Sequence, residues 1–105
     1  MKNITVEAIK ARLDAGEKLN IIDVREQAEY DDININAQLL PLSVIRNFET
    51  DIIDALKDQE ILVHCKSGVR SMEACMLLSQ MGFQNTVNVT GGIMAWLQAY
   101  PDVKL

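Results

Sequence analysis

The sequence contains little of what builds disulfide scaffolds or metal centres. Its 105 residues include two cysteines, Cys65 and Cys75, and one histidine, His64. A helix that begins near Arg70 would place Cys75 about 7 Å further along its axis, with the Cys65 loop folded back on the other side, so a disulfide is not expected. One histidine beside one cysteine offers no second ligand pair for zinc. We therefore expect two reduced thiols, no metal and no cofactor.

Long apolar runs and clustered basic residues are also scarce. No apolar run approaches the length needed to cross a bilayer, and the first residues, Met1 to Ile4, lack the apolar core of a secretory signal. The formal net charge is −5. Nucleic acids and anionic membranes attract clustered Lys and Arg, so neither is expected as a partner. We expect a cytoplasmic protein.

The composition is that of an ordinary globular protein, with 49% hydrophobic and 24% charged residues. This length suits one compact domain, which we place over residues 1–105. Apolar periodicity and capping residues predict helices over residues 6–15, 49–57, 70–81 and 93–99, and strands over residues 19–24, 60–64 and 86–89. Short helical turns are predicted over residues 26–30, a loop over 31–36 and an extended segment over 38–42. Short apolar strands that alternate with helices predict an α/β fold with a small parallel sheet of about five strands and helices on both faces.

The stretch from Ile61 to Ser71 is where we expect the chemistry. The strand predicted over residues 60–64 ends at Cys65, and in parallel sheets sites form beyond the carboxyl ends of the strands. Backbone N–H groups at a strand–loop–helix junction, together with the helix dipole, favour an anion and lower the pKa of a thiol. Cys65 is therefore the candidate nucleophile. Cys75, in mid-helix among apolar residues, is expected to be a core residue.

The residues that follow the cysteine can each help to hold an anion. Arg70 can bind an oxyanion through two parallel N–H bonds, and Lys66 adds a less directional charge. Ser67 and Gly68 allow backbone amides to form a concave nest, and Val69 is expected to pack. Because the loop contains no acidic residue, we expect a small positive site for a small anion.

The histidine before the loop is expected to be structural and hydrogen-bonded rather than a general base. Successive residues of a strand point to opposite faces of the sheet, so His64 should point away from Cys65.

Three segments taken together resemble a known family. They are Ile22-Asp23-Val24-Arg25-Glu26 with Glu29-Tyr30, then His64-Cys65-Lys66-Ser67-Gly68-Val69-Arg70-Ser71, then Gly91-Gly92-Ile93 with Trp96. In this order and spacing they look like a single-domain rhodanese over nearly the whole chain. The resemblance implies a sulfurtransferase in which Cys65 takes sulfane sulfur from a donor such as thiosulfate and becomes a persulfide. The sulfur then passes to a thiol, cyanide or another nucleophile.

By the same resemblance, Asp23 and Arg25 look like the family's Asp-x-Arg element. We interpret them as a charged brace at a strand end, with Arg25 also a candidate contact to the donor. One segment departs from the family pattern. Rhodanese-like chains usually carry a His-Ile-(Pro or Gly)-Gly-Ala segment, and Asn34-Ile35-Asn36-Ala37 stands in its place. This looks nearer to rhodanese domains fused to adenylyltransferases, and it leaves the donor, the acceptor and a possible sulfur-relay partner open.

Two other functions stay open at this point. Cys-dependent phosphatases also place an arginine after a loop cysteine, but with five residues between them. Here four residues separate Cys65 from Arg70, and Ser71 stands where that arginine would be. A tighter ring suits sulfur better than phosphoryl oxygens, and no general acid is evident. The other alternative is a non-catalytic binding module, or a carrier loaded with sulfur by a partner enzyme. The intact loop argues against the inert module and not against the carrier.

Overall fold

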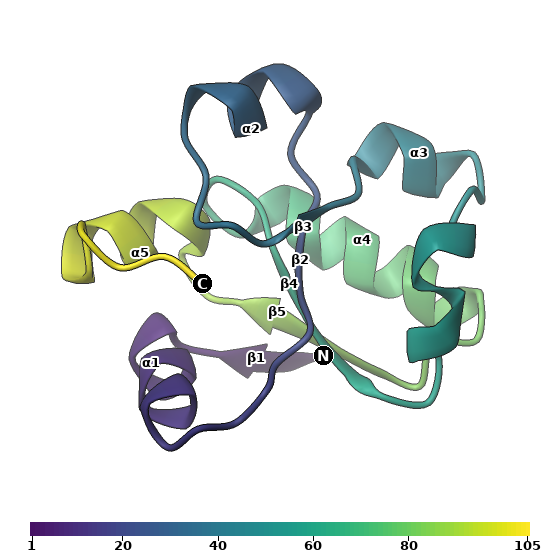
Figure 1. Cartoon of the computed structure of the whole chain (residues 1–105). Helices are drawn as coiled ribbons and strands as arrows, with labels where there is room; N and C mark the ends of the chain where they lie inside the picture. Colours follow the sequence, from purple (N-terminus) through teal and green to yellow (C-terminus); the bar gives the residue numbers. More distant parts are fainter.

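Five parallel strands form one sheet at the centre of the molecule. The computed structural model describes residues 1–105, and along the sheet the strands lie in the order β1 (Lys2–Ile4), β5 (Asn85–Val89), β4 (Glu60–His64), β2 (Ile21–Asp23) and β3 (Gln38–Leu39). All four strand pairs are parallel. The predicted α/β architecture is confirmed, and β4, which leads into the cysteine loop, is the middle strand (Figure 1).

Helices cover both faces of this sheet (Figure 1). One face carries α1 (Val6–Asp14) and α5 (Gly92–Ala99), and the other carries α3 (Leu42–Arg46), the 3₁₀ helix η1 (Asp51–Leu56) and α4 (Val69–Gln80). The short helix α2 (Gln27–Asp32) follows β2 at the carboxyl ends of the strands. The first helix begins as predicted, because the Thr5 side chain accepts a hydrogen bond from the Ala8 N–H at 3.1 Å.

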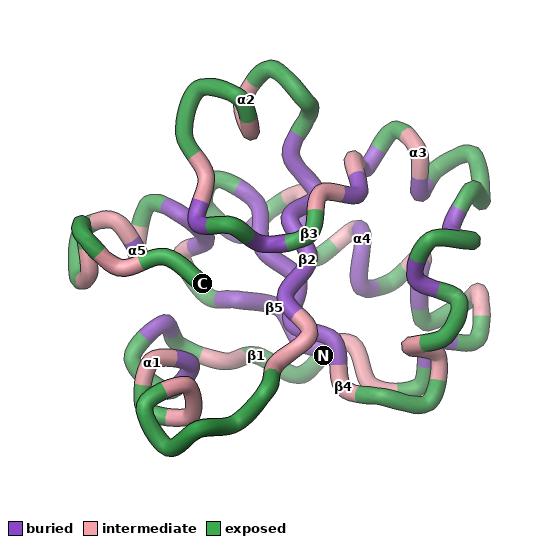
Figure 2. The backbone as a smooth tube through the Cα atoms, viewed as in Figure 1, coloured by how far each residue is buried: buried purple, intermediate pink, exposed green.

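Buried side chains form two clusters, one on each face of the sheet. Figure 2 shows that the backbone of the central strands is coloured as buried. The period-two alternation of β4 divides its residues between them. Ile61 and Val63 belong to the cluster under α4, whereas Leu62 belongs to the cluster under α1 and α5. This alternation fixes which face each side chain at the end of the strand reaches.

The first strand is the element that the sequence patterns did not indicate. β1 has three residues and pairs only with β5, as an edge strand. Two of its three residues are exposed. A segment this short shows no readable alternation of apolar and polar residues.

The amphipathic α-helix predicted over residues 49–57 is wrong. The segment forms the 3₁₀ helix η1, in which Ile53 is buried, whereas Ile52 and the preceding Phe48 are 66% and 70% exposed. In a 3₁₀ helix, residues three apart lie on the same face. Ile53 and Leu56 therefore face the core together, whereas Ile52, one position before Ile53, faces solvent.

Candidate active site

The loop after β4 wraps around the sulfur of Cys65. The Cys65 side chain lies in the cluster under α4, with 1% of the residue exposed. The Gly68 N–H donates to its Sγ at 3.1 Å, and the thiol lies 3.4 Å from the Ser71 Oγ. Gly68 has φ +113°, which residues with a side chain rarely adopt. Its backbone can therefore turn inward, toward the sulfur.

The N-terminus of α5 is hydrogen-bonded to the carbonyl groups of the loop. The N–H groups of Ile93 and Met94 donate to the carbonyls of Cys65 and Lys66, at 2.9 and 3.1 Å. These are helix N-terminal donors with no partner inside their own helix. A Cβ at Gly92 would lie 2.5 Å from the Cys65 carbonyl oxygen. The Gly91-Gly92 pair thus allows α5 to bind the loop carbonyls, which leaves the loop N–H groups free for the sulfur.

These contacts determine the acidity of the thiol. Burial of Cys65 favours the neutral form and acts to raise its pKa, but hydrogen bonds outweigh burial. The Ser71 hydroxyl and the backbone N–H groups of Ser71, Gly68 and Ser67 lower the pKa below its ordinary value. The loop therefore favours an anionic sulfur, as its position at a strand–loop–helix junction predicted.

The loop contains no acidic residue, but an acid from another element joins the predicted positive site. Arg70 donates from both terminal nitrogens to Glu29 of α2, at 2.7 and 2.8 Å. The hydrogen bond from Arg70 lowers the pKa of Glu29 to about 2, so the carboxylate stays charged. The two residues are 41 positions apart, so the loop sequence alone gave no sign of the acid.

A cleft of about 200 Å³ lies beside this ion pair. Arg25 and Lys66 line it together with two acids, Glu29 and Asp32. Lys66 is exposed and forms no ion pair. The cleft therefore has balanced charge, and Lys66 is its unpaired cation.

Asp23 and Arg25 form the buried brace that was predicted. They are 0% and 3% exposed, and Arg25 donates to Asp23 from Nε at 3.1 Å and from Nη2 at 2.8 Å. Nη2 also donates to the Ile33 carbonyl at 2.8 Å, and Nη1 to the Glu29 carbonyl at 3.4 Å. All three guanidinium nitrogens thus bond within the protein. The pair ties the end of β2 to the segment after α2.

Val69 does not pack in the core, contrary to prediction. It is the first residue of α4 and is 74% exposed. Val69 and Met72, one turn later, line a second groove of about 450 Å³ together with Ser67 and Asn88, and no charged residue contributes to it. The loop therefore lies between a charged cleft and a neutral groove.

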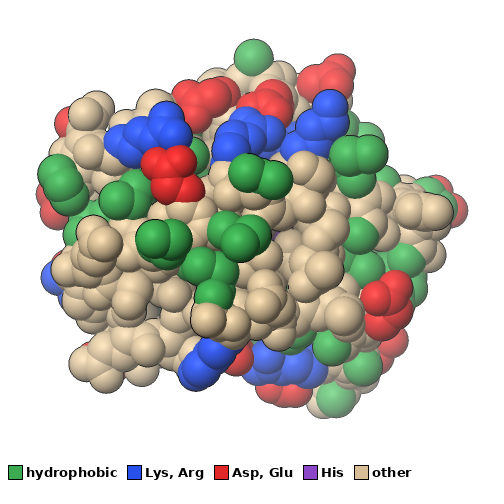
Figure 3. Space-filling model, turned by 180° about the vertical axis from the view of Figure 1, so that it is seen from behind, with side chains coloured by type: hydrophobic (Ala, Val, Ile, Leu, Met, Phe, Trp, Pro, Cys, Tyr) green, Lys and Arg blue, Asp and Glu red, His purple; other side chains and the backbone are tan.

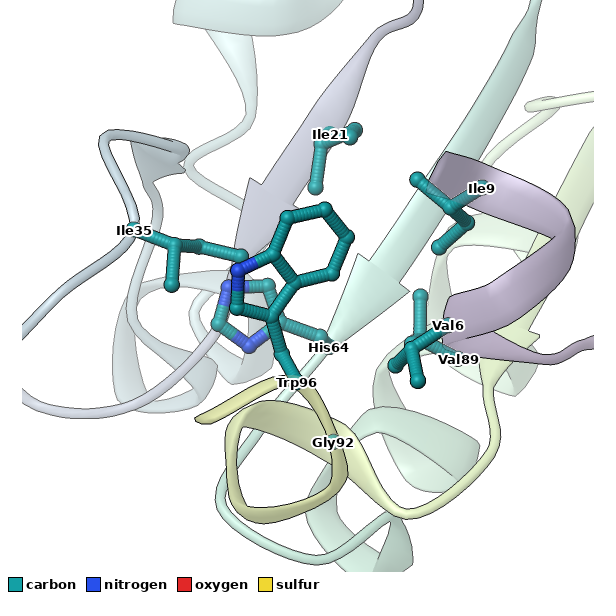
Figure 4. Close-up of a pocket in the computed structure, with 8 residues that line it drawn as sticks. All are labelled: Val6, Ile9, Ile21, Ile35, His64, Val89, Gly92 and Trp96. Atoms are coloured by element: carbon teal, nitrogen blue, oxygen red, sulfur yellow. The ribbon is translucent and has the colours of Figure 1, made fainter. Parts of the chain in front are cut away.

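His64 faces away from Cys65, as predicted. It lines a cavity of about 10 Å³ among apolar side chains of the opposite cluster, next to Trp96 (Figure 4). Its Nδ1 lies 3.1 Å from the Cys65 carbonyl oxygen, and its Nε2 lies 3.6 Å from the Asp23 carboxylate. Burial lowers the pKa of His64, so the ring is neutral near pH 7. Its position is structural rather than that of a base for the thiol.

On the surface, basic and acidic side chains are intermingled, and no histidine is visible on the face shown in Figure 3. No group of three or more His, Cys, Asp and Glu side chains could hold a metal ion. None of the helices has both the length and the apolar character needed to span a bilayer.

Three polar residues at the site were not assigned from the sequence. They are Glu29, which binds Arg70, and the pair Ser71 and Asn88, whose side chains are hydrogen-bonded to each other at 2.5 Å. Asn88 did carry a signal, because it is a polar residue between Val87 and Val89 in the predicted strand. A buried polar side chain requires a partner, and here that partner lies next to the sulfur.

Comparison with known proteins places this loop in a family. The model of the rhodanese-like domain matches residues 5–99. The chain is 40% identical over 102 residues to "Probable adenylyltransferase/sulfurtransferase MoeZ" of Mycobacterium tuberculosis, covering 95% of this chain and 26% of that protein. It thus spans about a quarter of the length of the first relatives that it matches.

Other relatives are nearer to it in length. "Putative sulfurtransferase YtwF" of Bacillus subtilis is 40% identical over 99 residues, covering 91% of this chain and 90% of the relative. "Putative sulfur carrier protein YrkF" of the same species is 34% identical, covering 89% and 49%. The crystal structure of a rhodanese-like domain protein from Staphylococcus aureus superposes with a TM-score of 0.79, at 34% identity over 91% of each chain. These names indicate sulfur transfer as the general activity of the proteins that this chain resembles.

Proposed function

Because the chain belongs to the rhodanese-like family, we propose that it transfers sulfane sulfur from a small anionic donor, such as thiosulfate, to a thiophilic acceptor through a persulfide on Cys65. One observation supports this most strongly. At the carboxyl end of the central strand, the Cys65 Sγ accepts the Gly68 N–H at 3.1 Å, and hydrogen bonds lower the pKa of the thiol despite burial. Such a site stabilises both the attacking thiolate and the persulfide anion.

The reaction has two displacements on sulfur. The Cys65 thiolate attacks the outer sulfur of thiosulfate, a new S–S bond forms, and the old S–S bond breaks so that sulfite leaves with the electron pair. Cyanide then attacks the outer sulfur of the persulfide, and thiocyanate leaves as the Cys65 thiolate is restored. The N–H groups of Ser67 and Gly68 stabilise the anionic sulfur, as an oxyanion hole stabilises oxygen.

Two cations guide the sulfonate end of the donor. Lys66 is exposed at the charged cleft and has no ion-pair partner, so it supplies the mobile charge. Arg70 is held by Glu29 and offers its remaining N–H donors from a fixed position. Arg25 acts through the brace with Asp23 rather than by binding the donor.

A sulfur carrier is the second candidate, because one relative has the name "Putative sulfur carrier protein YrkF". In this role a partner enzyme loads Cys65, and the same loop holds the persulfide until a relay protein accepts the sulfur. Two free thiols suit a reducing compartment, so we place either role in the cytoplasm.

Sulfite release from thiosulfate with cyanide as acceptor tests the proposal. The wild-type protein is expected to turn over and to gain the mass of one sulfur at Cys65 when cyanide is omitted, whereas Cys65→Ser does neither. No turnover and no mass gain with any donor would overturn the proposal. Loading that requires a desulfurase would favour the carrier. Hydrolysis of an aryl phosphate that depends on Cys65 would favour a phosphatase.

A further inference from the structure

The Ser71 hydroxyl has one proton and two candidate acceptors. Its Oγ lies 2.5 Å from Asn88 Oδ1, to which it donates, and 3.4 Å from the Cys65 sulfur, whose thiol donates to it. Ser71 is 0% exposed, so its hydroxyl depends on these two partners. Asn88 is 4% exposed and borders the neutral groove. When Cys65 is a thiolate, a donated hydrogen bond from Ser71 can stabilise it only if that proton turns away from Asn88.

The chain of hydrogen bonds continues from Asn88 to the edge of the sheet. The Asn88 Nδ2 donates to Asn3 Oδ1 at 3.1 Å. Parallel pairing sets this contact, because Asn3 of β1 and Asn88 of β5 are register partners. Asn3 is exposed, and its own Nδ2 lies 3.3 Å from the Met1 carbonyl. The thiol is thus connected through two buried side chains to a residue in contact with water.

The buried side chains in this row of hydrogen bonds can find partners in two ways, which differ in the direction of donation. In the first, the Cys65 thiol donates to Ser71, Ser71 donates to Asn88, and Asn88 donates to Asn3. In the second, the thiol proton has left to water, Ser71 donates to the thiolate, and the Asn88 amide turns by 180° to donate to Ser71. Its oxygen then accepts from the amide of Asn3. A carboxamide allows this because its oxygen and nitrogen occupy nearly equivalent positions.

We propose that Asn88 and Asn3 are positioning residues that set the direction in which the Ser71 hydroxyl donates, and that a paired turn of their two amides accompanies the change of Cys65 from thiol to anionic sulfur. This inference rests on the proposed function, because it concerns the reactive sulfur of the same site. It assigns a role to the N-terminal strand β1, which otherwise only completes the sheet edge.

The other charged or titratable groups near the sulfur cannot replace this chain. Arg70 interacts electrostatically with Cys65 but is bonded to Glu29. Cys75 lies in α4, as Arg70 does, and its interaction with Cys65 is only electrostatic. Lys66 is exposed, and His64 contacts the Cys65 carbonyl rather than the sulfur. From the strand side, β5 brings only the neutral Asn88.

Asn3→Asp tests the proposal, because a carboxylate accepts hydrogen bonds and donates none. It should hold Asn88 in the first direction and so keep the Ser71 proton from the thiolate. The readout is the pH profile of Cys65 alkylation by iodoacetamide in a Cys75→Ser background, which does not depend on sulfur transfer. We expect the rate below the thiol pKa to fall roughly tenfold, the usual effect of losing one hydrogen bond to a charged group.

Two controls distinguish an effect that passes through these hydrogen bonds from the electrostatic effect of the added negative charge. Thr90→Asp adds an equal charge at an exposed position beside the same groove and should leave the rate within about twofold at 0.5 M salt, because salt screens exposed charges. In a Ser71→Ala background, Asn3→Asp should lose its effect, because the hydroxyl that transmits it is gone. An equal effect of Thr90→Asp, an unchanged effect without the Ser71 hydroxyl, or no effect of Asn3→Asp in a folded protein would each overturn the proposal. Failure to form a persulfide with normal alkylation profiles would overturn the proposed function alone.

Discussion

Cys65 and Cys75 are equally buried and chemically opposite. Each is 1% exposed, and both belong to the cluster under α4. Yet burial raises the pKa of Cys75 to about 11, whereas the pKa of Cys65 lies below its ordinary value although burial acts on it in the same direction. The two thiols therefore share a desolvation effect and differ in something else.

The difference lies in hydrogen-bond donors. Cys75 is in the middle of α4, where backbone N–H groups are already bonded within the helix, and its main polar neighbour is Thr86. Cys65 precedes the same helix, where the N–H groups of Ser67, Gly68 and Ser71 are free to face the sulfur. Two buried thiols ten residues apart along one segment thus have pKa values that are shifted in opposite directions. Position relative to the helix start, rather than exposure, decides thiol chemistry here.

Replacing each sulfur by oxygen gives the largest expected effect on this comparison. Cys65→Ser should abolish sulfite release from thiosulfate, because a serine hydroxyl is a weak nucleophile for sulfur and cannot form a persulfide. Cys75→Ser is the matched control and should keep turnover within about threefold once folding is confirmed by circular dichroism. Loss of transfer in a folded Cys75→Ser protein would make Cys75 a participating thiol.

The second-largest expected effect on turnover comes from a substitution that displaces the Cys65 loop and leaves both cysteines in place. Gly92→Ala would place a Cβ 2.5 Å from the Cys65 carbonyl oxygen, so the loop must shift and its donors leave the sulfur. We expect turnover to fall roughly a hundredfold, since a displacement of about 1 Å can cost that much. The protein should also lose about 1–3 kcal/mol of stability, as overpacked sites do.

Gly82→Ala is the control for this substitution. Gly82 also has a positive φ, +96°, but nothing lies within 4 Å of its Cβ position. It should show a modest loss of stability from the backbone conformation alone and normal turnover. Equal turnover in the two alanine variants would contradict the role given to the α5 contact.

Alkylation compares the two thiols directly in one protein. At pH 7 an ordinary thiol is ionised several hundred times more than one with a pKa of about 11, and the lower intrinsic reactivity of a less basic thiolate offsets part of this. Because both cysteines are equally buried, Cys65 should react with iodoacetamide at least roughly tenfold faster, as followed by peptide mass spectrometry. Equal rates would mean that access, rather than ionisation, controls both.

The smallest expected effect concerns the ion pair beside the loop. The pKa of Glu29 in the folded protein, about 2, lies below its ordinary value of 4.5. The stabilisation by Arg70 is therefore complete above pH 4.5 and is lost as the pH falls through 2. For a pair that is about one-third exposed it should be on the order of 0.5–1 kcal/mol after solvent screening.

The difference in urea midpoint between wild type and Glu29→Gln measures this effect and should shrink between pH 5 and pH 2.5. The control is Glu73→Gln. Glu73 pairs with Arg46 at the same distance of 2.7 Å, but this pair is more exposed than the pair of Glu29 and Arg70, so the substitution should change the urea midpoint less. A larger effect at Glu73 would contradict the special position of the pair next to the loop.

The sequence predicted the local features of this site well and its long-range contacts poorly. The strand end, the loop, the helix and the opposite orientations of His64 and Cys65 follow from periodicity within one segment. The ion pair between Glu29 and Arg70 depends on how α2 lies against α4, which no local pattern contains. Asn88 could have been singled out as a polar residue between two valines of a predicted strand, but its partner in α4 is apparent only from the packing of that helix on the sheet.

Two errors have a similar origin. Val69 was expected to pack because it is apolar, yet at the first position of a helix that starts at the surface its side chain points outward. The 49–57 segment has apolar residues at spacings that suit an α-helix and a 3₁₀ helix alike, and the segment adopts the 3₁₀ form with only Ile53 buried. In both cases the residues are apolar, as the predictions assumed, but some of their side chains lie on the solvent side of the helix.

Peptide-resolved mass spectrometry of wild-type protein treated with thiosulfate tests the central claim most directly. The account predicts one added sulfur on the peptide that contains Cys65 and none on the peptide that contains Cys75, with cyanide removing the added sulfur. Sulfur on the Cys75 peptide, or on neither peptide, would contradict the claim that loop donors at the start of α4 make one of two equally buried thiols the carrier of sulfur.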